Sequence, residues 1–410
     1  MGRPPPEALL GHAFRTASGR VIAALAARLR DLDLAEEAFA EACARAAARW
    51  SDAAVPDDPA AWLYRTAERA ALDMIRRAAT RARVQPEPPP EPTIEEMMAS
   101  DAALIPDERL RLIFVCCHPA IAPDSRAALT LRLVCGLSTA EVAAAFLLTE
   151  PTLAQRLTRA KRKVAEAGIP FEVPGPQQWA ERLEAVLSTI EVAYAKAHED
   201  AAGAGRHAGF AAEMLELTDL LARLLPNEPE VHALAATIHF AEARRPARVT
   251  AAGEMIPLSE QNPADWRHDL IAAAGRHMEA AAKGPPRPRI VQAAIHQAWC
   301  RRRSLDNPPP WPEILALYDR LLSLRDDVVV RINRLVALAE VDGAGVALAE
   351  LQQLPSDRLG NFLPYHAVRA DLLRKEGRIG EARQSYDAAL ALDPAPAEAR
   401  WLARRRDERG

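Results

Sequence analysis

Polar and cationic side chains recur at helical spacing between residues 149 and 163. The amide of Gln155 can pair with adenine, and the guanidinium groups of Arg156 and Arg159 can donate to N7 and O6 of guanine. Lysine and arginine further along the helix are better placed for phosphates. We expect these residues to contact duplex DNA: Thr152, Gln155, Arg156, Arg159, Lys161 and Arg162. A basic helix end can also simply complement the helix dipole, and that alternative stays open.

Two short helices with a tight break between them are needed to present these side chains, and the pattern over Gly136–Lys163 predicts both. Leu153 and Leu157 give the second helix an apolar face. Thr149 is a suitable N-cap, and Pro151 falls in the first turn, where a missing N–H costs nothing. This is the layout of a helix-turn-helix, in which a basic second helix lies in the DNA major groove.

A second group of charged and aromatic residues comes earlier in the chain. Capture of single-stranded nucleic acid needs cations for the backbone and aromatic rings on which a flipped base can rest. Trp62 is expected in the core, and Tyr64 is the other aromatic candidate. The cationic candidates are Arg65, Arg69, Arg76 and Arg77. An acidic helical face precedes them, which is either a protein-contact surface or an ordinary solvated face: Asp33, Glu36, Glu37 and Glu41.

The fold class follows from composition and patterning. Hydrophobic residues make up 49% of the 410-residue chain, and alanine dominates them, while β-branched residues form no alternating runs. We therefore predict an all-α protein. Proline-rich stretches divide it into a first helical block (1–83), an acidic, extended linker (84–106), a block containing the helix-turn-helix (107–174) and a long helical tail (175–410).

Several classes of protein are disfavoured. The net charge of −4 restricts any nucleic-acid surface to a local patch, and five scattered cysteines fit a reducing cytoplasm. No apolar run reaches the length of a membrane span, and the first residues lack a signal core. No P-loop, dinucleotide fingerprint or nucleophile elbow occurs. We expect no enzyme activity, no cofactor and no metal site, with the Cys116–His118 run and most histidines serving as packing or surface residues.

The order of these blocks resembles that of an extracytoplasmic-function sigma factor of the sigma-70 family. The resemblance rests on Asp33–Glu41, Pro59–Ala67, Asp73–Arg77 and Gly136–Lys163. It implies that the acidic helix docks on the β′ clamp of core RNA polymerase, that the tryptophan- and arginine-containing helix opens the −10 element, and that the helix-turn-helix holds the −35 element near the β flap. The linker is implied to run through the polymerase between the two halves.

The tail is similar to the subgroup that carries a tetratricopeptide-like extension. Gly377, Ala382, Tyr386, Ala389 and Pro394 fit the small-residue, aromatic and proline spacing of such a repeat. Stacked hairpins form concave surfaces, so the tail is expected to bind a regulatory protein or to contact the rest of the chain. The alternative is a stand-alone helix-turn-helix regulator with a partner-sensing tail, which would bind duplex DNA without polymerase.

Overall fold

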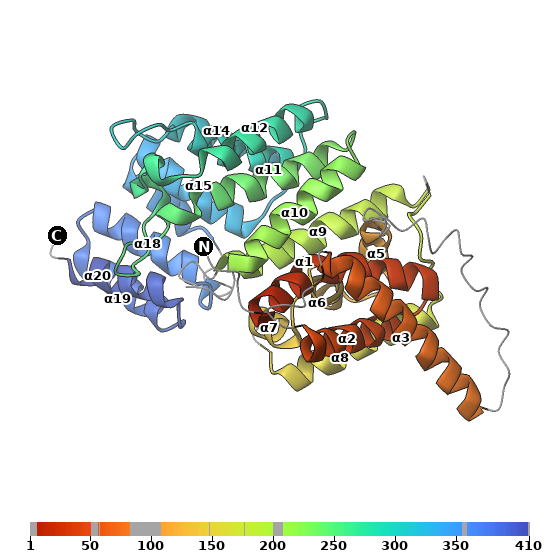
Figure 1. Cartoon of the computed structure of the whole chain (residues 1–410). Coiled ribbons are helices and arrows are strands. Elements are labelled where there is room, and N and C mark those ends of the chain that lie inside the picture. Colours follow the sequence, from red (N-terminus) through yellow and green to blue (C-terminus); the bar gives the residue numbers. More distant parts are fainter. Residues whose placement is uncertain are drawn as a thin grey trace. The chain divides into compact units, whose positions relative to one another are not determined.

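The computed structural model describes residues 6–50, 56, 58–82, 108–146, 148–175, 177–199, 208–354 and 359–408. These residues are helical apart from turns, short 3-10 segments and one isolated bridge between Val249 and Met255, so the all-α prediction is confirmed. The chain divides into two compact units, Met1–Lys196 and Ala197–Gly410 (Figure 1). The predicted linker 84–106 lies outside the described residues.

Three helices begin the first unit and pack against one another: α1 (Pro6–Leu29), α2 (Leu32–Arg49) and α3 (Pro59–Ala82). In α2, small and aromatic residues recur every three or four positions and form its buried face, and Asp31 caps its N-terminus by accepting from the Leu34 amide at 3.0 Å. Asp58 caps α3 in the same way, accepting from the Ala61 amide at 2.9 Å.

The second part of this unit contains α5 (Arg109–Cys116), α6 (Pro123–Leu133), α7 (Thr139–Ala145), α8 (Glu150–Glu166) and α9 (Trp179–Glu199). Helix α1 packs on both α5 and α6, and this approach requires a glycine. A Cβ at Gly19 would lie 2.0 Å from the carbonyl oxygen of Val134. In α9, Arg182 donates through Nη2 to the carbonyl of Phe114 at 2.6 Å, which attaches this helix to the first unit.

The second unit is a succession of helices that pack mainly on their neighbours along the chain. They are α10 (Ala208–Leu224), α11 (Pro229–Arg244), η1 (Arg245–Ala247), η2 (Leu258–Glu260), η3 (Pro263–Asp265), α12 (His268–Ala281), α13 (Pro288–Cys300), α14 (Trp311–Leu324), α15 (Val328–Val341), α16 (Ala344–Leu351), α18 (Leu363–Lys375), α19 (Ile379–Leu390) and α20 (Pro396–Asp407).

A helical hairpin, α18–α19, lies where the repeat signature was recognised. Gly377 turns between the helices with φ of 73°, a conformation that favours glycine. Tyr386 is 1% exposed and packs in a core shared with Ala382 and Ala389, while Pro394 follows the end of α19. The glycine lies at the turn, the small and aromatic residues lie in the core, and the proline lies after the second helix, as the repeat spacing predicts. The tetratricopeptide assignment itself stays a prediction.

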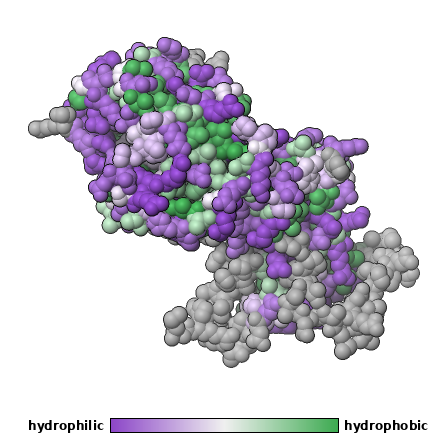
Figure 2. All heavy atoms as spheres, turned by 90° about the horizontal axis from the view of Figure 1, so that it is seen from above, coloured by the Kyte–Doolittle hydropathy of each residue, from purple (hydrophilic) through white to green (hydrophobic). Residues whose placement is uncertain are grey.

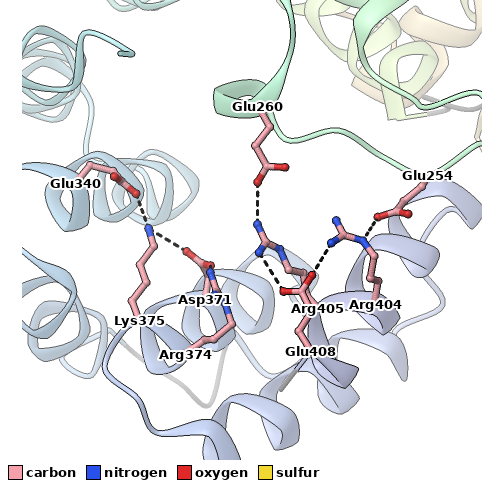
Figure 3. Close-up of polar contacts among 9 residues, drawn as sticks. All are labelled: Glu254, Glu260, Glu340, Asp371, Arg374, Lys375, Arg404, Arg405 and Glu408. Carbon is pink, nitrogen blue, oxygen red and sulfur yellow. Dashed lines mark hydrogen bonds and ion pairs between the residues drawn. The ribbon is translucent and has the colours of Figure 1, made fainter. Parts of the chain in front are cut away.

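The last helix of the unit, α20, is joined to the segment between α11 and α12 (Figure 3). Arg404 forms an ion pair with Glu254, and Arg405 contacts Glu260 at 2.8 Å. The Met255 amide also donates to the carbonyl of Ala397 at 3.0 Å. The C-terminal helix is therefore held by a segment about 145–150 residues earlier in the chain.

On the face drawn in Figure 2, hydrophilic side chains predominate and hydrophobic ones form only small groups. Across the described ranges, no helix combines the length and apolar character needed to span a membrane.

Candidate nucleic-acid and polymerase interface

The helix-turn-helix forms because both of its helices carry local N-terminal caps. At α7, the Ser138 amide donates to Glu141 Oε2 at 2.7 Å and the Glu141 amide donates to Ser138 Oγ at 3.2 Å, which is a reciprocal capping box. At α8, the Thr149 hydroxyl accepts from the Thr152 amide at 3.4 Å. Helix α8 packs on both α6 and α7, so its orientation is fixed by the fold.

One face of α8 is buried and another carries the predicted DNA contacts. Leu153, Leu157, Ala160 and Val164 form the buried face. The exposed residues Thr152, Gln155, Arg159 and Arg162 recur at three- and four-residue spacing and so form one stripe along the helix. We call these four residues the α8 stripe. Cationic and amide groups presented in this way suit a major groove.

Three of the predicted cationic contacts are engaged within the protein. Arg162 of the α8 stripe lies 3.3 Å from Glu166 in an exposed pair. Arg156, beside the α8 stripe, lies 3.9 Å from Asp124 through Nη1. Lys161 lies on a different side of the helix, where its side chain is 15% exposed and pairs with Asp33 and Glu36 of α2. Burial would lower the pKa of Lys161, but hydrogen bonds to these two carboxylates raise it above its ordinary value. In this arrangement Lys161 does not extend toward a phosphate.

The acidic residues of α2 are likewise divided between the surface and an internal contact. Glu37 is exposed, and Glu41 pairs with Arg45 at 2.8 Å. Glu36 is shielded between two cations: its Oε1 lies 2.8 Å from Arg132 Nη2, and its Oε2 lies 3.0 Å from Lys161 Nζ. Sequence reasoning missed Arg132, because nothing in its local pattern indicates a partner on α2.

On α3, arginines align with a tryptophan along the helix. Arg65, Arg69 and Arg76 are exposed and separated by four and seven residues, so they share a face. Trp62 precedes Arg69 by seven residues and belongs to the same face. It is only partly buried, with its ring 5.4 Å from that of Trp50 in an edge-on contact, and so the prediction that it belongs to the core is wrong.

The spacing between Trp62 and Arg69 would have indicated this alignment from the sequence. Tyr64 lies on another side of α3, where Glu68 and Arg28 form an ion pair. Burial raises the pKa of Tyr64, and Glu68 adds to that effect. Arg77 is exposed beside the shared face. The aromatic ring best placed beside the arginines is therefore that of Trp62.

Cys116 and Cys117 pack in the core, as expected, while the next residue, His118, is partly exposed. Cys116 and Cys117 are fully buried, all five cysteines are free, and Cys117 Sγ lies 3.5 Å from the hydroxyl of Thr130. Burial raises the pKa of both thiols. His118 accepts from the Ala120 amide through Nδ1 at 3.1 Å, which is a turn contact.

The geometry defines a helical protein with a helix-turn-helix and a separate arginine-bearing helix on one compact unit. Comparison with known families agrees. Residues 13–81 match sigma-70 region 2, and residues 111–164 match sigma-70 region 4. Residues 182–282 match a family of unknown function, DUF6596. No solved structure matches the chain.

Regions 2 and 4 are non-enzymatic domains with which transcription initiation factors bind core RNA polymerase and promoter DNA. The chain belongs to the sigma-70 family, and these two regions support a role in promoter recognition. It is similar over nearly its whole length to an uncharacterized protein, R00370, of Rhizobium meliloti (strain 1021). The two are 37% identical over 400 residues, which cover 95% of this chain and 93% of the relative.

Proposed function

We propose that this sigma-70 family member is an extracytoplasmic-function initiation factor in which two separate surfaces read one promoter. The observation that carries the proposal is the α8 stripe, which presents an amide and two guanidinium groups outward from a helix whose opposite face is buried. Gln155 and Arg159 would read base edges of the −35 element. Arg162 and Lys161 would contact phosphates, and Thr152 and Arg156 would make further contacts to the −35 element.

Region 2 supplies the second surface. Arg65, Arg69, Arg76 and Arg77 would hold the backbone of the −10 strand, and Trp62, rather than Tyr64, would support a flipped base. The β′ clamp would bind the acidic face of α2, formed by Asp33, Glu36, Glu37 and Glu41. The β flap would position region 4.

The ion pairs between α8 and α2 constrain this proposal. Lys161 forms ion pairs with Asp33 and Glu36. A residue predicted to contact DNA is therefore paired with two residues predicted to contact polymerase. Lys161 and Glu36 become available only if α8 separates from α2, whereas the Asp33 side chain is already 69% exposed. We therefore propose that the described arrangement is a closed form of the first unit, and that core polymerase opens it by competing for the carboxylates.

Reconstituted transcription tests the main proposal. Full-length protein added to core polymerase should give transcripts that begin at a defined promoter, and Gln155→Ala with Arg159→Ala should abolish dependence on the −35 sequence. Thr158→Ala, an exposed change on the same helix outside the α8 stripe, is the matched control, since the Thr158 hydroxyl donates to the Ala154 carbonyl of its own helix at 2.9 Å. Binding to promoter DNA with no initiation in the presence of core polymerase would contradict the proposal.

A stand-alone regulator is the alternative. Such a protein would bind duplex DNA without polymerase, usually as a dimer on a palindrome. Electrophoretic shifts with and without core polymerase distinguish the two. The Lys161 pairs favour a factor with low intrinsic DNA affinity, because they withdraw one cation from the DNA-contacting set.

The second unit is proposed to regulate the first or to bind a partner protein. The experiment compares the full chain with a chain ending at Lys196, which keeps most of α9 and its bond from Arg182 to Phe114. We expect altered transcript yield at equal folding of the first unit. Unchanged polymerase binding and unchanged promoter output would mean that the second unit has no regulatory role.

A further inference from the structure

Three helices of the second unit bring two histidines and a carboxylate together. Asp219 comes from α10, His239 from α11 and His277 from α12, helices that lie side by side (Figure 1). His239 Nε2 lies 3.3 Å from Asp219 Oδ1, and His277 Nε2 lies 3.1 Å from the same oxygen. The three ligand atoms all lie within 4.8 Å of one another.

The outer nitrogen of each imidazole is held by a hydrogen-bond partner. His239 Nδ1 lies 2.8 Å from the carbonyl of Ala235, which can only accept, so Nδ1 carries the proton. His277 Nδ1 lies 3.0 Å from Nδ1 of His232, whose Nε2 in turn lies 3.1 Å from the carbonyl of Pro226. Both rings are thereby oriented with Nε2 toward Asp219.

Proton counting shows that this network is incomplete. It contains five polar contacts: two to backbone carbonyls, one between the histidines, and two to the carboxylate. Each hydrogen bond needs one proton, and three neutral imidazoles carry only three. With neutral imidazoles, neither Nε2 atom carries a proton toward Asp219 Oδ1, and a divalent cation bound by both Nε2 atoms and Oδ1 would fill this place.

The distances fit such an ion. Ligands at about 2.0–2.1 Å from a tetrahedral Zn²⁺ lie about 3.3–3.4 Å apart, close to the two nitrogen-to-oxygen separations. Metal-ligating histidines also usually donate their other N–H to a backbone carbonyl or a similar acceptor, as His239 does to Ala235. The donor set of two imidazoles and one carboxylate suits divalent transition metals.

We propose that Asp219, His239 and His277 form a binding site for a divalent transition-metal ion, with Zn²⁺ as its first candidate. His232 is a positioning residue that fixes the tautomer of His277. The site would clamp α10, α11 and α12 together. Because Asp219 remains 37% exposed at its side chain, a fourth position would face solvent and accept water or an added ligand.

Zinc titration of the full-length, chelator-treated protein tests the site. We expect about one tightly bound Zn²⁺ per chain, lost in Asp219→Asn and in His277→Gln. His232→Gln should weaken binding by about 10–100-fold, as removal of an outer partner does. His366→Gln is the matched control, since His366 lies outside the site, with its Nε2 2.9 Å from the carbonyl of Gly360 and its ring edge-on to Tyr365. Co²⁺ in place of zinc should give visible absorption that disappears in Asp219→Asn.

Circular dichroism at each titration point separates loss of the site from loss of the fold, and the partly exposed Asp219 is the safer position for this purpose. The proposal is overturned if the wild-type protein takes up no zinc. It is also overturned if Asp219→Asn and His277→Gln keep the wild-type zinc content. Neither outcome depends on promoter recognition.

Discussion

Lys161 on α8 and Glu36 on α2 form an ion pair in which Nζ and Oε2 lie 3.0 Å apart, although 125 residues separate them in the chain. Both side chains are largely shielded, at 15% and 16% exposure. The pair joins sigma-70 region 4 to region 2, and each partner was expected to contact a different macromolecule. One contact therefore joins a predicted DNA contact to a predicted polymerase contact.

The energy of this pair can be isolated with a double-mutant cycle. Lys161→Ala and Glu36→Ala, singly and together, should give a coupling of about 1 kcal/mol in denaturant unfolding, because the pair is partly desolvated. The control cycle uses Arg162 and Glu166, which are 3.3 Å apart and well exposed, and should give no more than about 0.5 kcal/mol. Equal couplings in the two cycles would show that burial adds nothing.

The same contact predicts an alkaline dependence of stability. The pKa of Lys161 is raised in the folded state, so the folded protein holds this proton more tightly than the unfolded chain. The stabilisation is fully present below the unfolded lysine pKa of about 10.4, and it is lost as pH rises through the higher folded value. The difference in unfolding free energy between wild type and Lys161→Met should be constant near neutral pH and shrink only above that range. A difference that already falls near neutral pH would contradict the assignment.

Base reading and phosphate contact should separate along the α8 stripe. In the complex with core polymerase, Arg159→Ala should cost about 1–3 kcal/mol and relax sequence preference at one −35 position. Arg162→Ala should weaken binding to all sequences and reduce the salt slope by about one unit. Competition binding to single-base variants at several salt concentrations measures both. If the two substitutions behave alike, the proposed division of the stripe is wrong.

Trp62 should matter more than Tyr64 for the melted −10 strand. Loss of a stacking ring costs about 1–3 kcal/mol per base, so Trp62→Ala should weaken holoenzyme binding to a pre-melted promoter by that amount. Tyr64→Phe should have little effect, since it removes only a hydroxyl beside Arg28 and Glu68. Binding to fully duplex promoter and thermal unfolding serve as controls, because Trp62 also packs on Trp50.

The attachment of α20 should depend on Arg405. Its guanidinium lies 2.8 Å from Glu260 (Figure 3). It also lies 5.6 Å from the centre of the Trp401 ring, and the side chain is 18% exposed. We expect Arg405→Ala to destabilise the contact by about 1 kcal/mol and to accelerate amide exchange in α20 and at Met255. Arg378→Ala removes an exposed ion pair with Glu381 and is the control. Unchanged exchange at Met255 in Arg405→Ala would contradict the expectation.

Much of region 4 was predictable because its signals are local. The Thr149 cap, the proline in the first turn and the apolar spacing of Leu153 and Leu157 all act within a few residues, and together they define α8 and its exposed stripe. The all-α class and the α18–α19 hairpin followed in the same way from periodicity and from Gly377 at a turn.

Trp62 shows where local reasoning fell short. Its aromatic character alone favoured the core, whereas its place on the arginine face follows from a seven-residue spacing that was present in the sequence but not used. Its partial burial against Trp50 depends on how the chain returns after α2, which no local pattern specifies.

The sequence by itself determined the helices, their caps and the family to which the chain belongs, because hydrogen bonds and side-chain periodicity within a helix act over one or two turns. Only the tertiary structure decided that Lys161 meets Glu36 and that Asp219, His239 and His277 converge. Those contacts are between residues of separate helices, so they depend on how the buried faces of helices far apart in the sequence pack together.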